Sequence, residues 1–137
     1  MPDCLFCEIV AGRVPSVVVG ETEATLSFMD INPVNPGHVL TVPKRHSTDM
    51  WEMDADAFAE LAAAAHEVAR RVRRVLRPEG VNMFMANGAA AGQTVFHAHV
   101  HTIPRWPGDG WIDPSWVAAP GDPDEIAAIG ERLRAPR

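Results

Sequence analysis

Several features that mark other classes of protein are absent from this chain. No run of apolar residues approaches the length of a membrane span, and Met1-Pro2-Asp3-Cys4 has neither the basic region nor the apolar stretch of a signal peptide. Positive charge is scarce: 12 Lys and Arg stand against 18 Asp and Glu, a net charge of -6, which argues against general binding to nucleic acid. We therefore expect a soluble cytoplasmic protein with no nucleic-acid partner and no membrane partner.

Cysteine is scarce too, with two in 137 residues, and internal repeats and low-complexity tracts are missing. Two cysteines in a reducing compartment are more often thiols or metal ligands than a structural disulfide. The hydrophobic share of 47% suffices for a core, and the length fits one domain of ordinary size. The sequence therefore predicts a single domain over residues 1–137.

Histidine, in contrast, is concentrated in one place. Three of the six histidines, His97, His99 and His101, occupy alternate positions. In a β-strand their rings would share one face, with neighbours roughly 6.5–7 Å apart. A polar strand face without chemistry is disfavoured, because desolvated imidazoles need partners. The pattern predicts either a metal site or a site where imidazoles act as nucleophile, acid and phosphate ligand.

The remaining patterns predict an α+β domain on a mostly antiparallel sheet. We expect a hairpin over 16–29, strands at 38–42 and 81–86, and the histidine strand after them. A long helix should begin after Asp54, a candidate N-cap, and end before Pro78. Asp122-Pro123-Asp124-Glu125 has the layout of a capping box and predicts a short C-terminal helix.

The segment before the histidines suits an anion. Gly92-Gln93-Thr94 offers backbone N–H groups and side-chain donors, and Asn87 at the other end of this loop offers an amide. Taken alone, Asn87 suits a turn equally well. His38 and Asp30, taken alone, would be a buried core histidine and a turn residue.

Cys4-Leu5-Phe6-Cys7 has the spacing of a zinc knuckle that lacks two ligands. His46 and His97 are the candidates to complete a closed Cys₂His₂ site. A CxxC pair also occurs in redox proteins, but no thioredoxin-like pattern surrounds this one, so zinc is favoured. Two free thiols without metal remain the alternative.

Together these residues resemble the histidine triad (HIT) family, in the bacterial branch related to the Hint nucleotide hydrolases. The resemblance covers residues 4–105, and 106–137 form a variable tail with a short helix. The matching segments are Cys4-Leu5-Phe6-Cys7-Glu8-Ile9, Met29-Asp30-Ile31-Asn32-Pro33, Pro36-Gly37-His38-Val39-Leu40, Pro43-Lys44-Arg45-His46 and the run from Gly92 to Arg105.

The resemblance implies the HIT fold, a five-stranded antiparallel sheet with one long and one short helix, assembled as a homodimer. It implies that His99 is the nucleophile that attacks the α-phosphate of a purine nucleotide such as AMP or GMP and forms a nucleotidyl-histidine intermediate. It assigns phosphate contacts to Gln93, Thr94, Asn87 and His101, the ribose to Asp30, the base to Ile31 and a supporting role to His38. In zinc-containing members Cys4, Cys7, His46 and His97 match the metal ligands, with zinc structural and no organic cofactor.

The substrate stays open between nucleoside phosphoramidates, acylated nucleotides and dinucleoside polyphosphates. Two further hypotheses compete with this one. The triad His97, His99 and His101 would ligate a catalytic metal in a metal-dependent hydrolase, or the chain would be a non-enzymatic module that binds purine nucleotides and regulates partners. Trp106, Trp111 and Trp116 follow the triad and either line a base pocket or pack.

Overall fold

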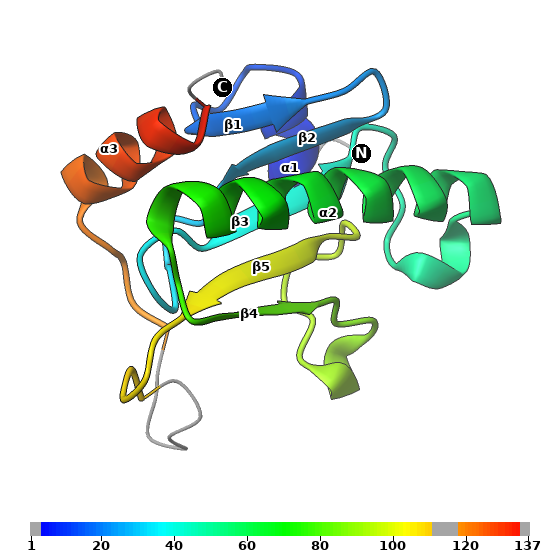
Figure 1. Cartoon of the computed structure of the whole chain (residues 1–137). Coiled ribbons are helices and arrows are strands. Elements are labelled where there is room, and N and C mark those ends of the chain that lie inside the picture. The colour runs from blue at the N-terminus through cyan, green and yellow to red at the C-terminus, as the bar shows by residue number, and fades with distance from the viewer. Residues whose placement is uncertain (1–3, 111–117, 135–137) are drawn as a thin grey trace.

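The computed structural model describes residues 4–110 and 118–134. Its centre is a five-stranded antiparallel sheet with the strand order β1-β2-β3-β5-β4 (Figure 1). The strands are β1 (Val18–Glu21), β2 (Thr25–Met29), β3 (Val39–Pro43), β4 (Gly80–Phe84) and β5 (Val100–Arg105), and the helices are α1 (Leu5–Val10), α2 (Ala55–Leu76) and α3 (Pro123–Arg134), with short 3₁₀ turns at Met50–Glu52 and Ala89–Ala91.

Both faces of the sheet are covered. The long helix α2 and the C-terminal α3 pack on one face over a cluster that includes Met29 and Val39. The short helix α1 packs on the other face, against a cluster that includes Phe28 and Leu40. Since successive residues of a strand face opposite sides, β2 and β3 are buried along their whole length. The functional residues described below lie on the α1 side.

Helix α2 has the bounds expected from the sequence. The Asp54 side chain accepts a hydrogen bond from the N–H of Ala57 at 2.8 Å and caps the N-terminus. Leu61, Val68 and Val72 form part of the buried stripe. The helix ends where Arg77 turns into the left-handed region, directly before Pro78. No helix within the described residues combines the length and the apolar character needed to cross a bilayer.

Two expectations about the elements need correction. The sequence did not predict α1, because its six residues make fewer than two helical turns, too short for a helical period to be visible. The prediction of one strand that carries all three histidines is also wrong in part, because β5 begins at Val100 and only His101 lies in it. Residues 93–99 leave the sheet and bond to the segment after β3, as when Ala98 N–H donates to the Ser47 carbonyl at 2.7 Å.

Gly37 sets the entry into β3. Its φ is +92°, and a Cβ at this position would lie 2.4 Å from Leu76 Cδ1. Glycine alone tolerates both the backbone conformation and the close approach. The turn therefore holds the end of α2 against the loop that delivers His38 to the sheet.

Candidate active site and metal centre

His99 is held in one tautomer by the backbone. Its Nδ1 lies 2.7 Å from the carbonyl oxygen of His97, and a carbonyl can only accept, so Nδ1 carries the proton. The other nitrogen, Nε2, is then left with a lone pair. The side chain is 5% exposed, and its ring lines a cavity.

His38 and His101 form a hydrogen-bonded pair in which the donor and the acceptor can both be assigned. The backbone N–H of Val34 donates to His38 Nδ1 at 3.0 Å, which places the proton of the neutral ring on Nε2. That Nε2–H faces His101 Nδ1 at 3.0 Å and donates to it. The proton of a neutral His101 therefore sits on its own Nε2, and this ring also lines the cavity.

Burial keeps these imidazoles neutral. It lowers the pKa of both His38 and His101 to about 4, with the neighbouring His99 adding to the effect. The pKa of His99 is lowered too, by burial, while its bond to the His97 carbonyl and the charge of Asp30 oppose the shift. A neutral imidazole with a free lone pair is a competent nucleophile near pH 7.

The cavity beside these rings has a volume of about 480 Å³. One part of the cavity is apolar, and its walls are α1 and the hydrophobic cluster on which α1 packs. The other part is polar, and His38, His99, His101 and Asp30 border it together with the exposed Thr94. The apolar walls include Leu5, Phe6, Ile9, Val14, Phe28 and Leu40.

Asp30 and Ile31 lie at the edge of this cavity. Asp30 Oδ1 accepts from the N–H of Asn32 at 2.8 Å, and Oδ2 lies 3.4 Å from His38 Nε2. These contacts fix the carboxylate beside the histidines. Ile31 is 64% exposed although it is apolar, which suits a residue that covers a flat ligand.

Two of the expected phosphate contacts are engaged elsewhere. Gln93 is buried and does not line the cavity: its Oε1 accepts from Gly88 N–H, and its Nε2 donates to the carbonyls of Thr48 and Val95. Asn87 accepts from the N–H of Met50 at 2.8 Å and also lies outside the lining. Both ends of the Gln93 amide are therefore bonded to the protein, whereas the bond of Asn87 uses only its Oδ1 and leaves its expected phosphate contact a prediction.

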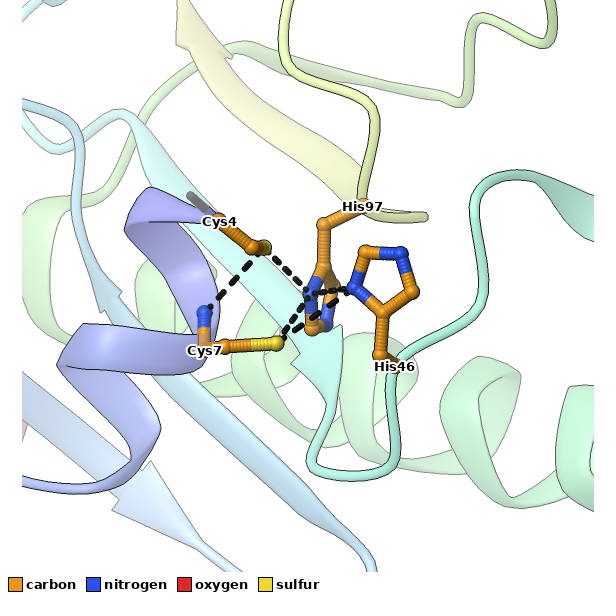
Figure 2. A group of neighbouring side chains, drawn as sticks. All are labelled: Cys4, Cys7, His46 and His97. Atoms are coloured by element: carbon orange, nitrogen blue, oxygen red, sulfur yellow. Dashed lines mark hydrogen bonds between the residues drawn. The ribbon is translucent and has the colours of Figure 1, made fainter. Parts of the chain in front are cut away.

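The second cluster joins Cys4 and Cys7 at the start of α1 to His46 and His97, which arrive from two separate loops (Figure 2). His97 Nε2 lies 2.8 Å from the carbonyl of Pro43 and donates to it, so the lone pair of Nδ1 points at the cysteines. That Nδ1 lies 3.2 Å from Cys4 Sγ, 3.6 Å from Cys7 Sγ and 3.2 Å from His46 Nδ1.

This donor set fits zinc. Tetrahedral bond lengths of about 2.3 Å to sulfur and 2.0–2.1 Å to nitrogen place neighbouring ligand atoms roughly 3.3–3.8 Å apart. The distance from Cys7 Sγ to His46 Nδ1 is 3.4 Å, and the four ligand atoms lie within 4.8 Å of one another. The arrangement therefore provides four ligands of the right type, which leaves no open position for a substrate.

The ring nitrogens of His97, His99 and His101 do not converge on one point that a metal ion could occupy. His97 Nδ1 faces the cysteines, and His99 Nδ1 is bonded to the backbone. Asp30, His38 and His101 form a second acidic and imidazole group. In that group the Val34 N–H places the proton of His38 on the nitrogen that faces His101, so this nitrogen has no lone pair for an ion.

No pattern in the sequence singles out Phe6 or Phe84. The Phe6 ring lies against both His97 and His99, and Phe84 stacks on His101 with centroids 4.6 Å apart. Phe84 pairs with His101 across β4 and β5, a register that a sequence alone does not reveal. Trp106 is half-buried and does not line the cavity, and Trp111 and Trp116 lie outside the described residues.

Comparison with known proteins adds three similarities to a family-model match. The family model described as the HIT domain matches residues 11–108 of this chain. The adenosine 5'-monophosphoramidase hnt1 of Schizosaccharomyces pombe is 35% identical over 130 residues, 95% of each chain. A Zn-bound histidine triad family protein from Mycobacterium smegmatis superposes with a TM-score of 0.84 at 36% identity, covering 97% of this chain and 91% of that one. A hypothetical histidine triad nucleotide-binding protein from Sulfolobus tokodaii gives 0.85 at 32%, covering 96% and 89%.

Proposed function

This chain belongs to the HIT domain family, and on that premise we propose that it is a nucleotidyl hydrolase that uses His99 as its nucleophile. Its substrates are purine nucleotide conjugates, cleaved at the α-phosphate. The observation that carries the proposal is the tautomer of His99, whose backbone bond leaves the Nε2 lone pair on a ring that lines the cavity.

The reaction proceeds in two displacements. His99 Nε2 attacks the α-phosphorus, a P–N bond forms, and the bond to the leaving group breaks as that group takes up a proton from solvent. Water then attacks the phosphorus and loses a proton to solvent, the P–N bond breaks, and a nucleoside monophosphate leaves while His99 returns to its neutral form. In this proposal His101 Nε2–H and the Thr94 hydroxyl donate to the phosphoryl oxygens, which is supported by the position of both residues on the cavity wall. Asp30 accepts from the ribose hydroxyls, and the apolar wall receives the base.

The charge of the cavity restricts the kinds of leaving group that the site can accept. Among the described residues that line it, none is Lys or Arg, and Asp30 adds a negative charge. A dinucleoside polyphosphate brings several negative charges, which need cationic partners. An amine or an acyl group brings none. We therefore favour nucleoside phosphoramidates and acyl nucleotides over dinucleoside polyphosphates.

The test is a substrate panel of adenosine phosphoramidate, an acyl adenylate and diadenosine polyphosphates. We expect kcat/KM for AMP release from the first two to exceed that from the polyphosphates by at least about tenfold. The reverse order contradicts the proposed leaving group. Tight AMP binding without turnover of any substrate contradicts the enzyme and favours a nucleotide-binding module.

We also propose that the chain holds one structural zinc through Cys4, Cys7, His46 and His97. The ligand distances and the four-ligand set support this assignment, and one similar structure is described as Zn-bound. Such a site ties α1 to the loops after β3 and before β5. Zinc takes no part in the displacement steps above.

A homodimer is the third part of the proposal. Strand β4 is an edge of the sheet, with β5 on one side. Its Met83 is 43% exposed and its Phe84 38%, which is unusual for large apolar side chains on an edge. Pairing of β4 with its copy around a two-fold axis would cover both residues and join two sheets into one.

A further inference from the structure

We propose that Phe6 is a positioning residue that couples the Cys4–Cys7–His46–His97 cluster to the orientation of His99. The proposal rests on the role of His99 as nucleophile given above. Phe6 stands inside the CxxC segment, between the two cysteines, and its side chain is 4% exposed. It is therefore the buried residue that the cysteines hold most directly.

The Phe6 ring contacts one member of each site. Its centroid lies 5.8 Å from that of His97, at an interplanar angle of 68°, and 5.2 Å from that of His99, at 90°. Both are edge-to-face arrangements, in which the position of one ring restricts the plane of the other. Phe6 thus touches a candidate zinc ligand and the candidate nucleophile at once.

His99 needs this contact, because its hydrogen bond fixes only one ring atom. The bond from Nδ1 to the His97 carbonyl still lets the imidazole plane tilt about that line. Phe6 and His101 restrict the tilt, the latter at 4.9 Å and 62°. The direction of the Nε2 lone pair, and hence the line of attack on phosphorus, depends on these rings.

The cysteines in turn fix Phe6. Cys4 caps α1 by accepting from the N–H of Cys7 at 3.3 Å, and both sulfurs face His97 Nδ1. A helix of six residues has little stability of its own, so its position depends on its contacts. Loss of the four-ligand constraint should therefore release Phe6 and, with it, the plane of His99.

The experiment compares Phe6→Leu with Phe28→Leu. Both phenylalanines line the cavity and pack on each other at 5.4 Å, but no ring contact joins Phe28 to either histidine among the described residues. Both changes can raise KM through the lost wall. We expect kcat for adenosine phosphoramidate to fall about 10- to 100-fold further in Phe6→Leu than in Phe28→Leu.

The readout that a merely structural role would not move is the ring nitrogen spectrum of His99, measured by ¹⁵N NMR without substrate. In wild-type protein stripped with a chelator, the His99 signals should shift or broaden, and added zinc should restore them. Phe28→Leu should show the same reversal. Phe6→Leu should bind zinc within about threefold of wild-type affinity and yet leave the His99 signals unrestored.

A Cys7→Ser variant provides the second route if Phe6→Leu folds poorly. This variant should show the His99 spectrum of chelator-treated wild-type protein whether or not zinc is added. The coupling is overturned if the His99 signals ignore zinc in wild-type protein, or if Phe6→Leu restores them as Phe28→Leu does. Because these spectra are recorded without substrate, an inactive protein with intact coupling would contradict the proposed function and leave the coupling standing.

Discussion

At the scale of single residues, the proposed reaction makes turnover depend on His99. Its Nε2 lone pair is set by one backbone bond at 2.7 Å, and alanine removes both the nucleophile and the covalent route. We expect His99→Ala to lower AMP release from adenosine phosphoramidate by more than about 1,000-fold, with AMP affinity within about threefold of wild type. His66→Ala, which removes an exposed histidine on α2, is the control. Activity within about tenfold of wild type would show that His99 is not the nucleophile.

Asp30 supplies the negative charge at the cavity edge. If it accepts from the ribose hydroxyls, Asp30→Ala removes charge-assisted hydrogen bonds worth roughly 1.5–3 kcal/mol, or about 10- to 150-fold in AMP affinity. Asp30→Asn keeps one acceptor oxygen and should lose less. Calorimetric titration with AMP measures both variants, and circular dichroism checks the fold. Unchanged affinity in the alanine variant would remove Asp30 from the ribose site.

At the scale of elements, the His38–His101 pair links the start of β3 to β5 and makes stability depend on pH. Both rings have a folded-state pKa of about 4, whereas an unfolded histidine titrates near pH 6.5. Between these two pH values the unfolded chain binds more protons than the folded protein, so the free energy of unfolding rises with pH. The stabilisation is therefore lost as the pH falls from about 6.5 to 4. Above about pH 6.5 the stabilisation is fully present.

Urea unfolding at several pH values, with chelator present throughout, tests this dependence. In His38→Gln the acid slope should be shallower by up to about 1.4 kcal/mol per pH unit, the value for one proton. His66→Gln serves as the exposed control. Equal slopes in His38→Gln and wild type would show that His38 is not the group that destabilises the fold in acid.

Helix α1 is the element that the proposed zinc would stabilise. If zinc closes the four-ligand site, chelation removes ligand-linked stability of roughly 3–4 kcal/mol, which corresponds to a fall in Tm on the order of 10 °C. Cys7→Ser should start from the lower Tm and not respond to chelator. Elemental analysis of protein purified without chelator should find one zinc per chain, and its absence there would contradict the site.

At the scale of the whole molecule, the proposed dimer depends on pairing between two copies of β4. A charge at the exposed Met83 should prevent apolar pairing of two edges. We expect wild-type protein to sediment as a dimer and Met83→Arg as a folded monomer. Glu23→Arg, an exposed change in the turn between β1 and β2, should stay dimeric. A wild-type monomer at micromolar concentration would rule the dimer out.

The sequence alone determined the α+β class, the bounds of the long helix, and the alternate histidines and CxxC pair around which the two clusters form. These features follow from local signals: apolar spacing along α2, the Asp54 cap, alternate histidines and a CxxC pair. It also grouped Cys4 and Cys7 with His46 and His97, which the fold brings within 4.8 Å. Chemistry that depends on residue type and short spacing can be read from the chain.

Only the tertiary structure decided how these residues face one another. Alternation predicted one row of three rings, yet His97 and His99 leave the strand because Pro43 and Ser47 compete for their segment. Gln93 looks like a phosphate ligand from composition, but backbone groups of Gly88, Thr48 and Val95 bond to both ends of its side-chain amide. Tautomers, cross-strand pairing and the contact between Phe6 and His99 arise between segments far apart in the chain, and no local pattern encodes such meetings.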